Sequence, residues 1–527
     1  MSKRRSYYFI YIGISICLFG GYYYCTIPAN SFSGDHVYMI EQTKEILGGH
    51  FRLVGMRTSR LQWNFPIINY LLIPLIAITS NAWFLYVSTS VTYVLGIWSL
   101  SWILLKYRPF SEFLIFASLS LTHVWSLFYS SFLWPPNYIP FFVSLFIICF
   151  FHYLRNSENV WFFHGASLFL NIAFQLHTMS VVLIFGFVLA LTMLGKLPRY
   201  RHWFLQVGLQ IFLISPWIIF HLFVIDWGKE PEYHSSLFKH FFSPAQAFMN
   251  YLSGTGLTRE FSRYLFYGTN TFPYEKFWFA WLSIGGWILL LLLIWGLWNG
   301  HKILNLKSIN WIKIRYRLLP YCHEETDINR AYPVAIYCLF LPVLLYQFSG
   351  IYMEPHYFQF LTPLMFLLVA TLPGQTKHPT KRKIAWICIL VVVIIQGSFS
   401  YWRAAEEHRS PYLDDIGYTQ VLAKVVAEQC KDNPQIRFAS NYGYRTSLPA
   451  QEITLPEYFG YDKWFHFRFD PELAEFDRTG TLHCKLLLIF QNKLLEKSPI
   501  VNWHLRLLKP VLKLEVHNNQ IWIIGDQ

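Results

Sequence analysis

The sequence predicts a polytopic α-helical membrane protein that ends in a small α/β domain. The chain has 527 residues, of which 54% are hydrophobic and only 14% are charged, against roughly 25% charged in ordinary soluble domains. Long apolar runs recur before residue 403, and several reach the roughly 17–25 residues that a bilayer helix needs. The last quarter carries 15 basic and 16 acidic residues. We therefore expect a membrane module over 1–402 and a separate domain over 403–527.

The net charge of +13 is a feature of many nucleic-acid-binding proteins, but its position along this chain argues against that class. Of the 28 basic residues before 403, nineteen fall in the terminus or in short segments between apolar runs, on one side of the expected membrane. That asymmetry is typical of membrane topology. We expect the lipid bilayer to be a partner and nucleic acid not to be one.

The apolar runs predict eleven spans. They cover 7–29, 83–105, 111–131, 139–154, 160–175, 178–194, 203–222, 278–298, 331–349, 357–373 and 384–401. A further run, 65–79, carries two prolines and is bounded by Asn64 and Asn81. We interpret it as an interfacial or re-entrant helix rather than a span.

The basic residues predict the orientation of the spans. Lys3, Arg4 and Arg5 precede the first run, which lacks a small-residue cleavage site and is expected to be an uncleaved anchor. The N-terminus is then cytoplasmic. With 65–79 not crossing, each basic short loop also falls inside, and the domain at 403–527 falls outside. The long external loops are 30–82 and 223–277.

The first external loop begins with a predicted amphipathic helix. Asp35 stands where an N-cap is expected, and Gly48 and Gly49 stand where the helix would end. Between them, apolar residues share one face: Val37, Ile40 and Leu47.

Arginines follow this helix at positions 52, 57 and 60. A carboxylate at a helix start with arginines nearby suits an acid/base group beside a phosphate-binding site. The alternative is that Asp35 only caps the helix and that the arginines meet anionic lipid headgroups.

Four short motifs follow one another along the chain. They are Gly34-Asp35-His36 in the first loop, Asn64-Phe65-Pro66-Ile67 at a helix start, Pro136-Asn137 within WPPNYIP, and His356-Tyr357 within EPHYFQFLTPL. Together with the first span and the basic turns, this order resembles the GT-C glycosyltransferases of the protein O-mannosyltransferase and lipid A aminoarabinose transferase type. The resemblance covers residues 1 to about 400 in architecture.

The resemblance implies an enzyme of the bacterial inner membrane with a GT-C-like fold and a periplasmic C-terminal domain. It would be an inverting glycosyltransferase that moves a sugar from a polyprenyl-phosphate donor to a glycan, lipid or protein acceptor on the non-cytoplasmic face. Asp35 matches the family's general base. His36 replaces the family's usual Glu, Asn137 stands where a second Asp is expected, and the Lys of the helix-start motif is missing.

Site residues follow from the resemblance and from side-chain chemistry. Donor phosphate binding is expected from Arg52, Arg57, Arg60, His177 and His356. Substrate binding is expected from His36, Tyr38, Trp63, Asn137 and Tyr357, and Trp134 and Tyr138 also stand at external helix ends, where aromatic rings can face a sugar. The alternatives are interfacial aromatic anchors, structural histidines within the bundle, and a helix cap at Asn137.

The second external loop, 223–277, predicts short amphipathic helices on the membrane surface around a flexible Gly254-Thr255-Gly256. The loop also carries Asp226, Glu230, Glu232, Arg259 and Arg263. In the GT-C interpretation it shapes the acceptor side; alternatively it is a surface connector.

The tail, 403–527, predicts a helix over 415–429 and strands in QIRFAS, CKLLLIF, VLKLEV and QIWIIG, with His517-Asn518-Asn519 turning the last two into a hairpin. Cys430 and Cys484 are its only cysteines, and an external position would allow a disulfide between them.

Several function classes lack their motifs here. No Walker loop, GxGxxG, HExxH or CxxC pattern is present, which argues against an ATPase, a dinucleotide enzyme and a zinc protease. An O-antigen polymerase or ligase and, with less support, a secondary transporter remain alternatives. No cofactor is defined, and the role of a divalent cation, the sugar and the acceptor stay open.

Overall fold

The structure is a computed structural model of the whole chain. It describes residues 2–30, 34–56, 63–223, 243–258, 274–304, 328–346, 355–376 and 378–409, together with six strands between 435 and 524.

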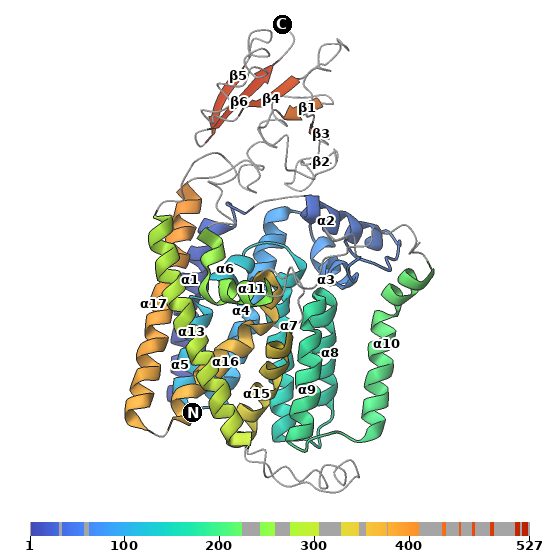
Figure 1. Cartoon of the computed structure of the whole chain (residues 1–527). Coiled ribbons are helices and arrows are strands. Elements are labelled where there is room, and N and C mark those ends of the chain that lie inside the picture. The colour runs from blue at the N-terminus through green and yellow to red at the C-terminus, as the bar shows by residue number, and fades with distance from the viewer. Residues whose placement is uncertain are drawn as a thin grey trace.

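The described part before residue 410 is helical, with long helices that run side by side (Figure 1). The α-helices are α1 (Ser2–Thr26), α2 (Gly34–Leu47), α3 (Ile67–Ile76), α4 (Ala82–Tyr107), α5 (Phe110–Ser120), α6 (Val124–Tyr129), α7 (Ile139–Arg155), α8 (Trp161–Leu176), α9 (Val181–Met193), α10 (Tyr200–Phe223), α11 (Ser243–Ser253), α13 (Glu275–Leu304), α15 (Ile328–Tyr346), α16 (Thr362–Gln375) and α17 (Pro379–Arg409). Short 3₁₀ helices are η1 (Pro135–Tyr138), η2 (Thr178–Ser180), η4 (Thr255–Thr258) and η6 (Pro355–Leu361).

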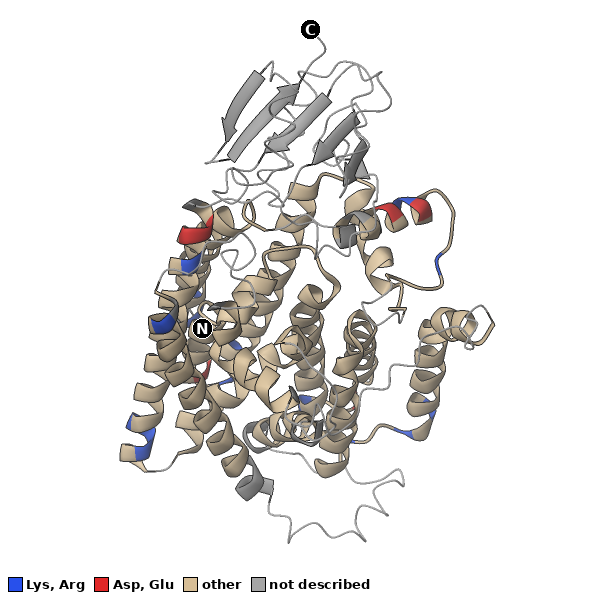
Figure 2. Ribbon diagram, turned by 45° about the horizontal axis from the view of Figure 1, so that its top comes forward, with Lys and Arg blue, Asp and Glu red and all other residues tan. Residues whose placement is uncertain are grey.

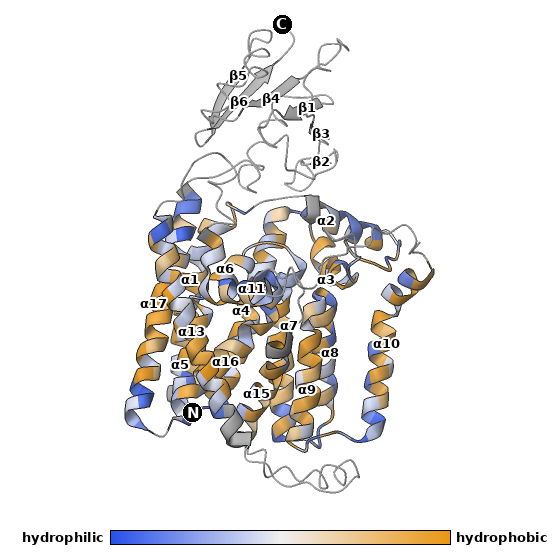
Figure 3. Cartoon of the chain, in the orientation of Figure 1, coloured by the Kyte–Doolittle hydropathy of each residue, from blue (hydrophilic) through white to orange (hydrophobic). Residues whose placement is uncertain are grey.

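The bundle has the charge and hydropathy pattern of a membrane protein. Among the described residues, seven helices are long and apolar enough to cross a bilayer: Arg4–Thr26, Ala82–Tyr107, Pro135–Arg155, Tyr200–Phe223, Lys276–Asn299, Pro355–Gln375 and Pro379–His408. Apolar residues fill the middle of the bundle, and charged residues gather toward its two ends (Figures 2 and 3). The predicted class, a polytopic helical membrane protein, is confirmed.

The bundle has two ends that the chain visits alternately. One end, here the N-terminal end, holds the start of α1 and the turns that join α4 to α5, α7 to α8, α9 to α10 and α16 to α17 (Figure 1). The opposite end holds α2, η1, η2 and η6. The basic turns predicted to share one side therefore do share one end of the bundle, in the part of the chain that is described.

All eleven predicted spans contain helix, but the run 111–131 is interrupted, so the prediction of one continuous span there was wrong. Helix α5 ends at Ser120, and α6 begins at Val124. The carbonyls of Leu121 and Thr122 accept hydrogen bonds from Tyr401 Oη (3.0 Å) and Ser400 Oγ (3.1 Å) on α17. A helix can break inside a bundle where a neighbouring helix satisfies the backbone in this way.

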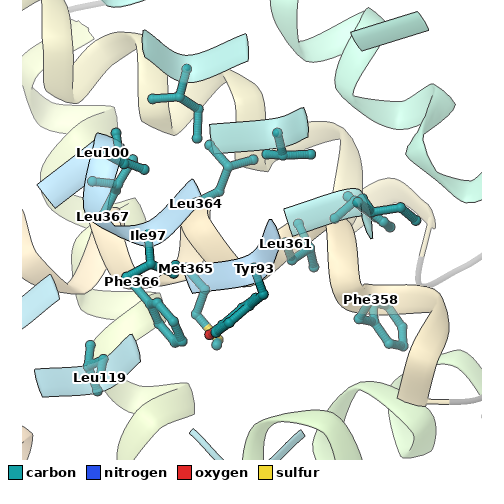
Figure 4. Close-up of a cluster of buried hydrophobic side chains, with 14 of the residues drawn as sticks. Tyr93, Ile97, Leu100, Leu119, Phe358, Leu361, Leu364, Met365, Phe366 and Leu367 are labelled. Carbon is teal, nitrogen blue, oxygen red and sulfur yellow. The ribbon is translucent and has the colours of Figure 1, made fainter. Parts of the chain in front are cut away.

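The centre of the bundle is packed with aliphatic and aromatic side chains from α4 and α16. Tyr93, Ile97 and Leu100 of α4 lie beside Leu364 and Leu367 of α16 (Figure 4), and all are at most 1% exposed. Such packing holds the opposite-end residues at fixed positions, because core side chains at this density move little.

The loop 30–82, which the sequence predicts to be external, contains the two expected helices, α2 and α3. Helix α2 ends at Leu47, and Gly49 follows with φ +92°, a conformation that glycine adopts without strain. Helix α3 has ten residues, about 15 Å, which is too short to cross the bilayer, as predicted for the run 65–79. Asn69 Nδ2 of α3 donates to Gln42 Oε1 of α2 at 2.6 Å. The two helices are therefore held together by a buried polar contact as well as by apolar packing.

The loop 223–277, which the sequence predicts to be external, differs from its prediction in the part that the structure describes. Helix α11 is amphipathic, but it is buried against the bundle rather than laid on the surface: Phe248, Tyr251 and Leu252 are at most 7% exposed. Gly254 is not a flexible point, since its φ is +81° and a Cβ there would lie 2.8 Å from Val124. The charged residues predicted for this loop, at 226, 230, 232, 259 and 263, lie outside the described residues.

The tail contains a mixed sheet with the order β2-β3-β1-β4-β6-β5. The strands are β1 (Gln435–Phe438), β2 (Ile453–Thr454), β3 (His466–Phe469), β4 (Lys485–Ile489), β5 (Leu512–Val516) and β6 (Asn519–Ile524). β1 runs parallel to β3 and β4, whereas β5 and β6 pair antiparallel. The four predicted strands and the final hairpin pairing are confirmed, and β2 and β3 were not predicted. The expected helix 415–429 and both Cys430 and Cys484 lie outside the described residues.

A buried ion pair ties three helices together at the N-terminal end of the bundle. Arg108, just past α4, donates from Nε and Nη2 to the two carboxylate oxygens of Glu112 on α5, each at 2.9 Å. The guanidinium carbon lies 4.6 Å from the ring centre of Tyr332 on α15. Both charged side chains are at most 5% exposed.

We expect Glu112→Leu to lower the free energy of unfolding by about 3 kcal/mol or more, because it leaves the Arg108 guanidinium buried without its counter-charge. The double variant Arg108→Met/Glu112→Leu should recover most of that loss. Thermal unfolding in detergent measures both, with Glu158→Gln in the exposed turn after α7 as the control. Equal losses in the single and double variants would contradict this account.

Candidate active site

Three short 3₁₀ helices meet at the end of the bundle opposite the N-terminus. η1 leads into α7, η2 into α9 and η6 into α16, and each of η1 and η2 packs against η6. Prolines begin η1 and η6, where a missing N–H costs nothing because a helix start has no intrahelical acceptor for it. The result is a set of irregular backbone segments gathered from three distant parts of the sequence.

Aromatic and imidazole rings from these segments form a cluster, here the histidine cluster: Trp134, His177, His356 and Tyr357. The ring centres of His356 and Trp134 are 4.5 Å apart, those of His177 and Tyr357 4.7 Å, and those of His177 and His356 5.9 Å. His356 is 8% exposed. Two predicted phosphate-binding residues and one predicted substrate-binding residue, Tyr357, are therefore brought together.

The backbone around His177 fixes which ring nitrogen carries the proton. His177 follows α8 directly and caps η2, because its Nδ1 accepts a hydrogen bond from Met179 N at 3.3 Å. The proton of the neutral ring is then assigned to Nε2. Partial burial lowers the pKa of His177 to about 4, which favours an uncharged ring with an N–H donor at neutral pH.

Asn137 lies at the same end, within η1, and is 1% exposed. Its Nδ2 donates to the carbonyl of Phe132 at 2.6 Å, which closes the turn before α7. Its Oδ1 is buried and has no hydrogen-bond partner among the described residues. Asn137 therefore does not cap α7, as the alternative interpretation had it, and it keeps one buried acceptor for another donor.

Segment 130–134, which carries Trp134, is unwound and largely buried, and side chains from elsewhere donate hydrogen bonds to its backbone. The carbonyl of Ser130 accepts from Ser90 Oγ (2.9 Å), and that of Ser131 accepts from Asn30 Nδ2 (3.0 Å). Ser130 and Ser131 are at most 1% exposed. Segment 130–134 is thus held by hydrogen bonds to helix α4 and to the turn after α1. These bonds fix the position of Trp134 in the histidine cluster.

Helix α2 contacts segment 130–134. His36 is 4% exposed, and its ring centre lies 5.5 Å from that of Tyr86 and 6.3 Å from that of Phe132. Phe132 in turn stacks on Trp134 at 6.2 Å. The rings of Phe132 and Trp134 therefore connect His36, the neighbour of Asp35, with His356.

Asp35 itself is the second residue of α2, which begins at Gly34, so it lies within the first turn rather than before it. A carboxylate there is favoured by the helix dipole. Its side chain is outside what the structure describes. Tyr38, one turn on, is half-buried, and burial raises the pKa of its hydroxyl.

The predicted arginines are not brought to the histidine cluster in the described residues. Arg52 pairs with Glu45 in the last turn of α2, and both side chains are more than a third exposed. Its carbonyl accepts a hydrogen bond from Tyr70 Oη of α3 at 2.9 Å. Arg57 and Arg60 lie outside the described residues. Trp63 lies against α10 instead, with its ring centre 5.6 Å from Phe220 and its carbonyl accepting from Trp217 Nε1 at 2.9 Å.

Sequence reasoning missed several residues of this region. The rings of Phe132 and Tyr86 contact His36 of α2. Gln359 of η6 is 1% exposed, and its Nε2 has no hydrogen-bond partner among the described residues. The signal for Gln359 was a lone amide in an apolar run. The ring contacts of Phe132 and Tyr86 left no sequence signal, because aromatic residues make up 20% of the chain.

The described residues contain no group of three or more His, Cys, Asp and Glu side chains placed to hold a metal ion. His177 and His356 form a pair only, which leaves the role of a divalent cation as open as the sequence left it.

Comparisons with known proteins give a limited result. No family model matches the sequence, and the curated proteins contain no match. Among solved structures, ArnT from Cupriavidus metallidurans in the apo state aligns over 99% of this chain and 99% of its own, with 10% sequence identity and a TM-score of 0.49. ArnT from the same organism bound to undecaprenyl phosphate aligns over the same shares, with 11% identity and a TM-score of 0.43. TM-scores below 0.5 do not establish a shared fold, so this likeness assigns no activity to the chain.

We expect His177→Asn to flatten the pH dependence of stability between about pH 6.5 and pH 4. In that window the unfolded wild type binds a proton at His177 that the folded protein does not. The stability linked to this group is therefore fully present above about pH 6.5 and is lost as the pH falls toward 4. Asn keeps an acceptor for the cap and does not titrate.

Thermal unfolding across this pH range measures the effect, with exposed His50→Asn as the matched control. If His177→Asn and wild type lose stability in parallel, the buried neutral state of His177 is wrong.

Proposed function

We propose that the protein is a membrane glycosyltransferase of the inverting type, which moves a sugar from a polyprenyl-phosphate donor to an envelope acceptor on the non-cytoplasmic face. The observation that carries the proposal is the histidine cluster. Residues that the sequence motifs single out at 134, 177, 356 and 357 come from distant segments and lie within ring contact of one another. Asn137 and His36 lie on the elements beside them.

The proposed reaction needs a base for the acceptor. Asp35 would take the proton of the acceptor hydroxyl, whose oxygen attacks the anomeric carbon of the sugar. The bond between that carbon and the phosphate oxygen breaks, and the phosphate leaves with the electron pair. Asp35 stands next to His36, which reaches the cluster through Phe132 and Trp134. In-line displacement then requires Asp35 with the acceptor on one face of the anomeric carbon and the phosphate-binding donors on the opposite face.

The departing lipid phosphate needs hydrogen-bond donors and positive charge. His177 Nε2–H supplies a donor at a fixed position, because the cap on Nδ1 holds the ring. A bound phosphate would favour the imidazolium form. Protonation of Nδ1 would then break the cap to Met179, so charge at this ring would come with a change in η2. Arg52, Arg57, Arg60 and His356 are the further candidates for this role.

The sugar would lie against the aromatic rings. The rings of Trp134 and Tyr357, which both contact His356, would supply apolar faces, and Asn137 Oδ1 would accept from a sugar hydroxyl or amine. A buried acceptor discriminates strongly between ligands with and without the matching donor, since an unmet polar group is costly. The sugar and the acceptor are not defined by these contacts.

We expect Asp35→Asn to lower sugar transfer by about 100-fold or more, the usual loss on removing a general base. Asn preserves any capping role of this position, so the substitution isolates the carboxylate. Transfer is measured in membranes with a panel of polyprenyl-phosphate sugars, and the control is Glu41→Gln on the exposed side of the same helix. Retained transfer at normal expression would sink the catalytic assignment of Asp35.

The proposal also needs the C-terminal domain and α2 on the outer side. A reporter that works only outside the cytoplasm, fused after residue 402, should be active, and the same reporter in the turn between α7 and α8 should be silent. This follows because basic residues favour the cytoplasmic side and the basic turns share the N-terminal end. Activity in the reverse pattern would overturn the orientation.

A further inference from the structure

A groove runs along the outside of the bundle at the N-terminal end, far from the histidine cluster. It is lined by Ser99 and Trp102 of α4, by Tyr8 and Phe9 of α1 and by Ile148 of α7. Its volume is about 750 Å³, within the roughly 300–1,000 Å³ of pockets that hold small molecules. The lining is mostly apolar.

Helix packing explains why the groove exists. At Gly96, α7 comes so close to α4 that an added Cβ would lie 2.9 Å from Phe141 Cα. One turn further along α4, at Ser99, the small side chain leaves space that Trp102 and Tyr8 border without filling; their ring centres are 4.9 Å apart. Tyr8 Oη donates to the carbonyl of Trp98 at 3.0 Å, which holds the Tyr8 ring in place.

The open end of the groove is basic. Arg5 lines it directly. Arg4 donates from Nη1 to the carbonyl of Leu105 at 3.0 Å, and Lys106 and Arg155 both lie over the ring of Tyr107, at 4.8 and 3.9 Å from its centre. These cations stand at the ends of the three helices that form the groove. Among the acidic residues described here, Glu112 is paired with Arg108, and Glu158 lies in the exposed turn after α7.

We propose that this groove binds one anionic glycerophospholipid from the leaflet at the N-terminal end of the bundle. Its acyl chain would lie against Phe9, Trp102 and Ile148, and its phosphate would meet Arg5. The apolar, lipid-facing lining suits an acyl chain, and the arginine at the mouth suits an anionic headgroup at the level of the interface. The occupant differs from the proposed donor, because Arg5 and the histidine cluster lie at opposite ends of the bundle.

The test measures lipid retention on the full chain. The protein is purified from nanodiscs that contain equal parts phosphatidylglycerol and phosphatidylcholine, and bound lipid is counted by native mass spectrometry. Wild type should retain phosphatidylglycerol in preference. Arg5→Gln, which removes the charge at the groove, should lower that retention by about fivefold, the worth of roughly one charged contact at a membrane surface. Ser99→Phe, which puts a ring into the groove, should lower it by at least as much.

Two matched controls decide what the loss means. Ile394→Phe adds bulk at a position of α17 that is 55% exposed, and Arg382→Gln removes a charge at the start of the same helix; neither should change retention. Equal retention of both lipids, no effect of Ser99→Phe, or equal effects of Arg5→Gln and Arg382→Gln would overturn the site. A final arm adds polyprenyl phosphate: displacement of phosphatidylglycerol by it, abolished in Ser99→Phe, would overturn the assignment to a glycerophospholipid. No arm depends on sugar transfer.

Discussion

The backbone of a chain inside a bilayer must find all its hydrogen bonds within the protein, and the candidate site depends on how this molecule meets that constraint. At residues 121–123 and 130–134, on either side of α6, the chain leaves regular helix while still largely buried. The exposed carbonyls are taken up by side chains of other elements: Tyr401 and Ser400 on α17, Ser90 on α4, Asn30 after α1. Without these donors the segment would have to remain helical.

Irregular backbone at this end of the bundle is what brings the rings of the histidine cluster together. A continuous helix presents side chains at regular intervals on its surface, whereas the unwound segment directs Phe132 and Trp134 toward α2 and η6. The same principle operates at η2, where His177 caps the turn between two helices and so acquires a defined tautomer. The polar side chains that stabilise the breaks and the rings that form the cluster are therefore parts of one arrangement.

The sequence was sufficient to predict the helices, because apolar runs of bilayer length leave little choice of structure. It predicted that 65–79 would not cross, because only then do all the basic short loops fall on one side of the membrane, and α3 is indeed ten residues long. It failed at 111–131, because a break that is satisfied by distant side chains leaves no local signal. It failed at 254, because a glycine with positive φ against Val124 has the same sequence signature as a flexible one. In the tail it missed β2 and β3, which are only two and four residues long.

For the candidate site, the sequence predicted which residues would be polar or aromatic at one end of the bundle but not how they combine. His177, His356 and Tyr357 lie within ring contact, whereas Arg52 pairs with Glu45 and Trp63 packs on α10. The difference has a physical origin. The three cluster residues belong to segments pinned by helix packing on both sides. Arg52 and Trp63 belong to a loop, where the nearest carboxylate or aromatic surface decides the contact.

The lowered pKa of His177, whose side chain is partly buried, bears on the proposed reaction. A ring whose Nδ1 accepts from the backbone and whose pKa is held near 4 cannot neutralise a phosphate without taking up a proton and releasing the cap. Burial disfavours the imidazolium form of His177, so a negatively charged ligand nearby is needed to stabilise it. An uncharged sugar cannot do this. If the proposed reaction takes place here, the phosphate group of the donor, and not its sugar, is what would change the protonation of His177 and the turn that it caps.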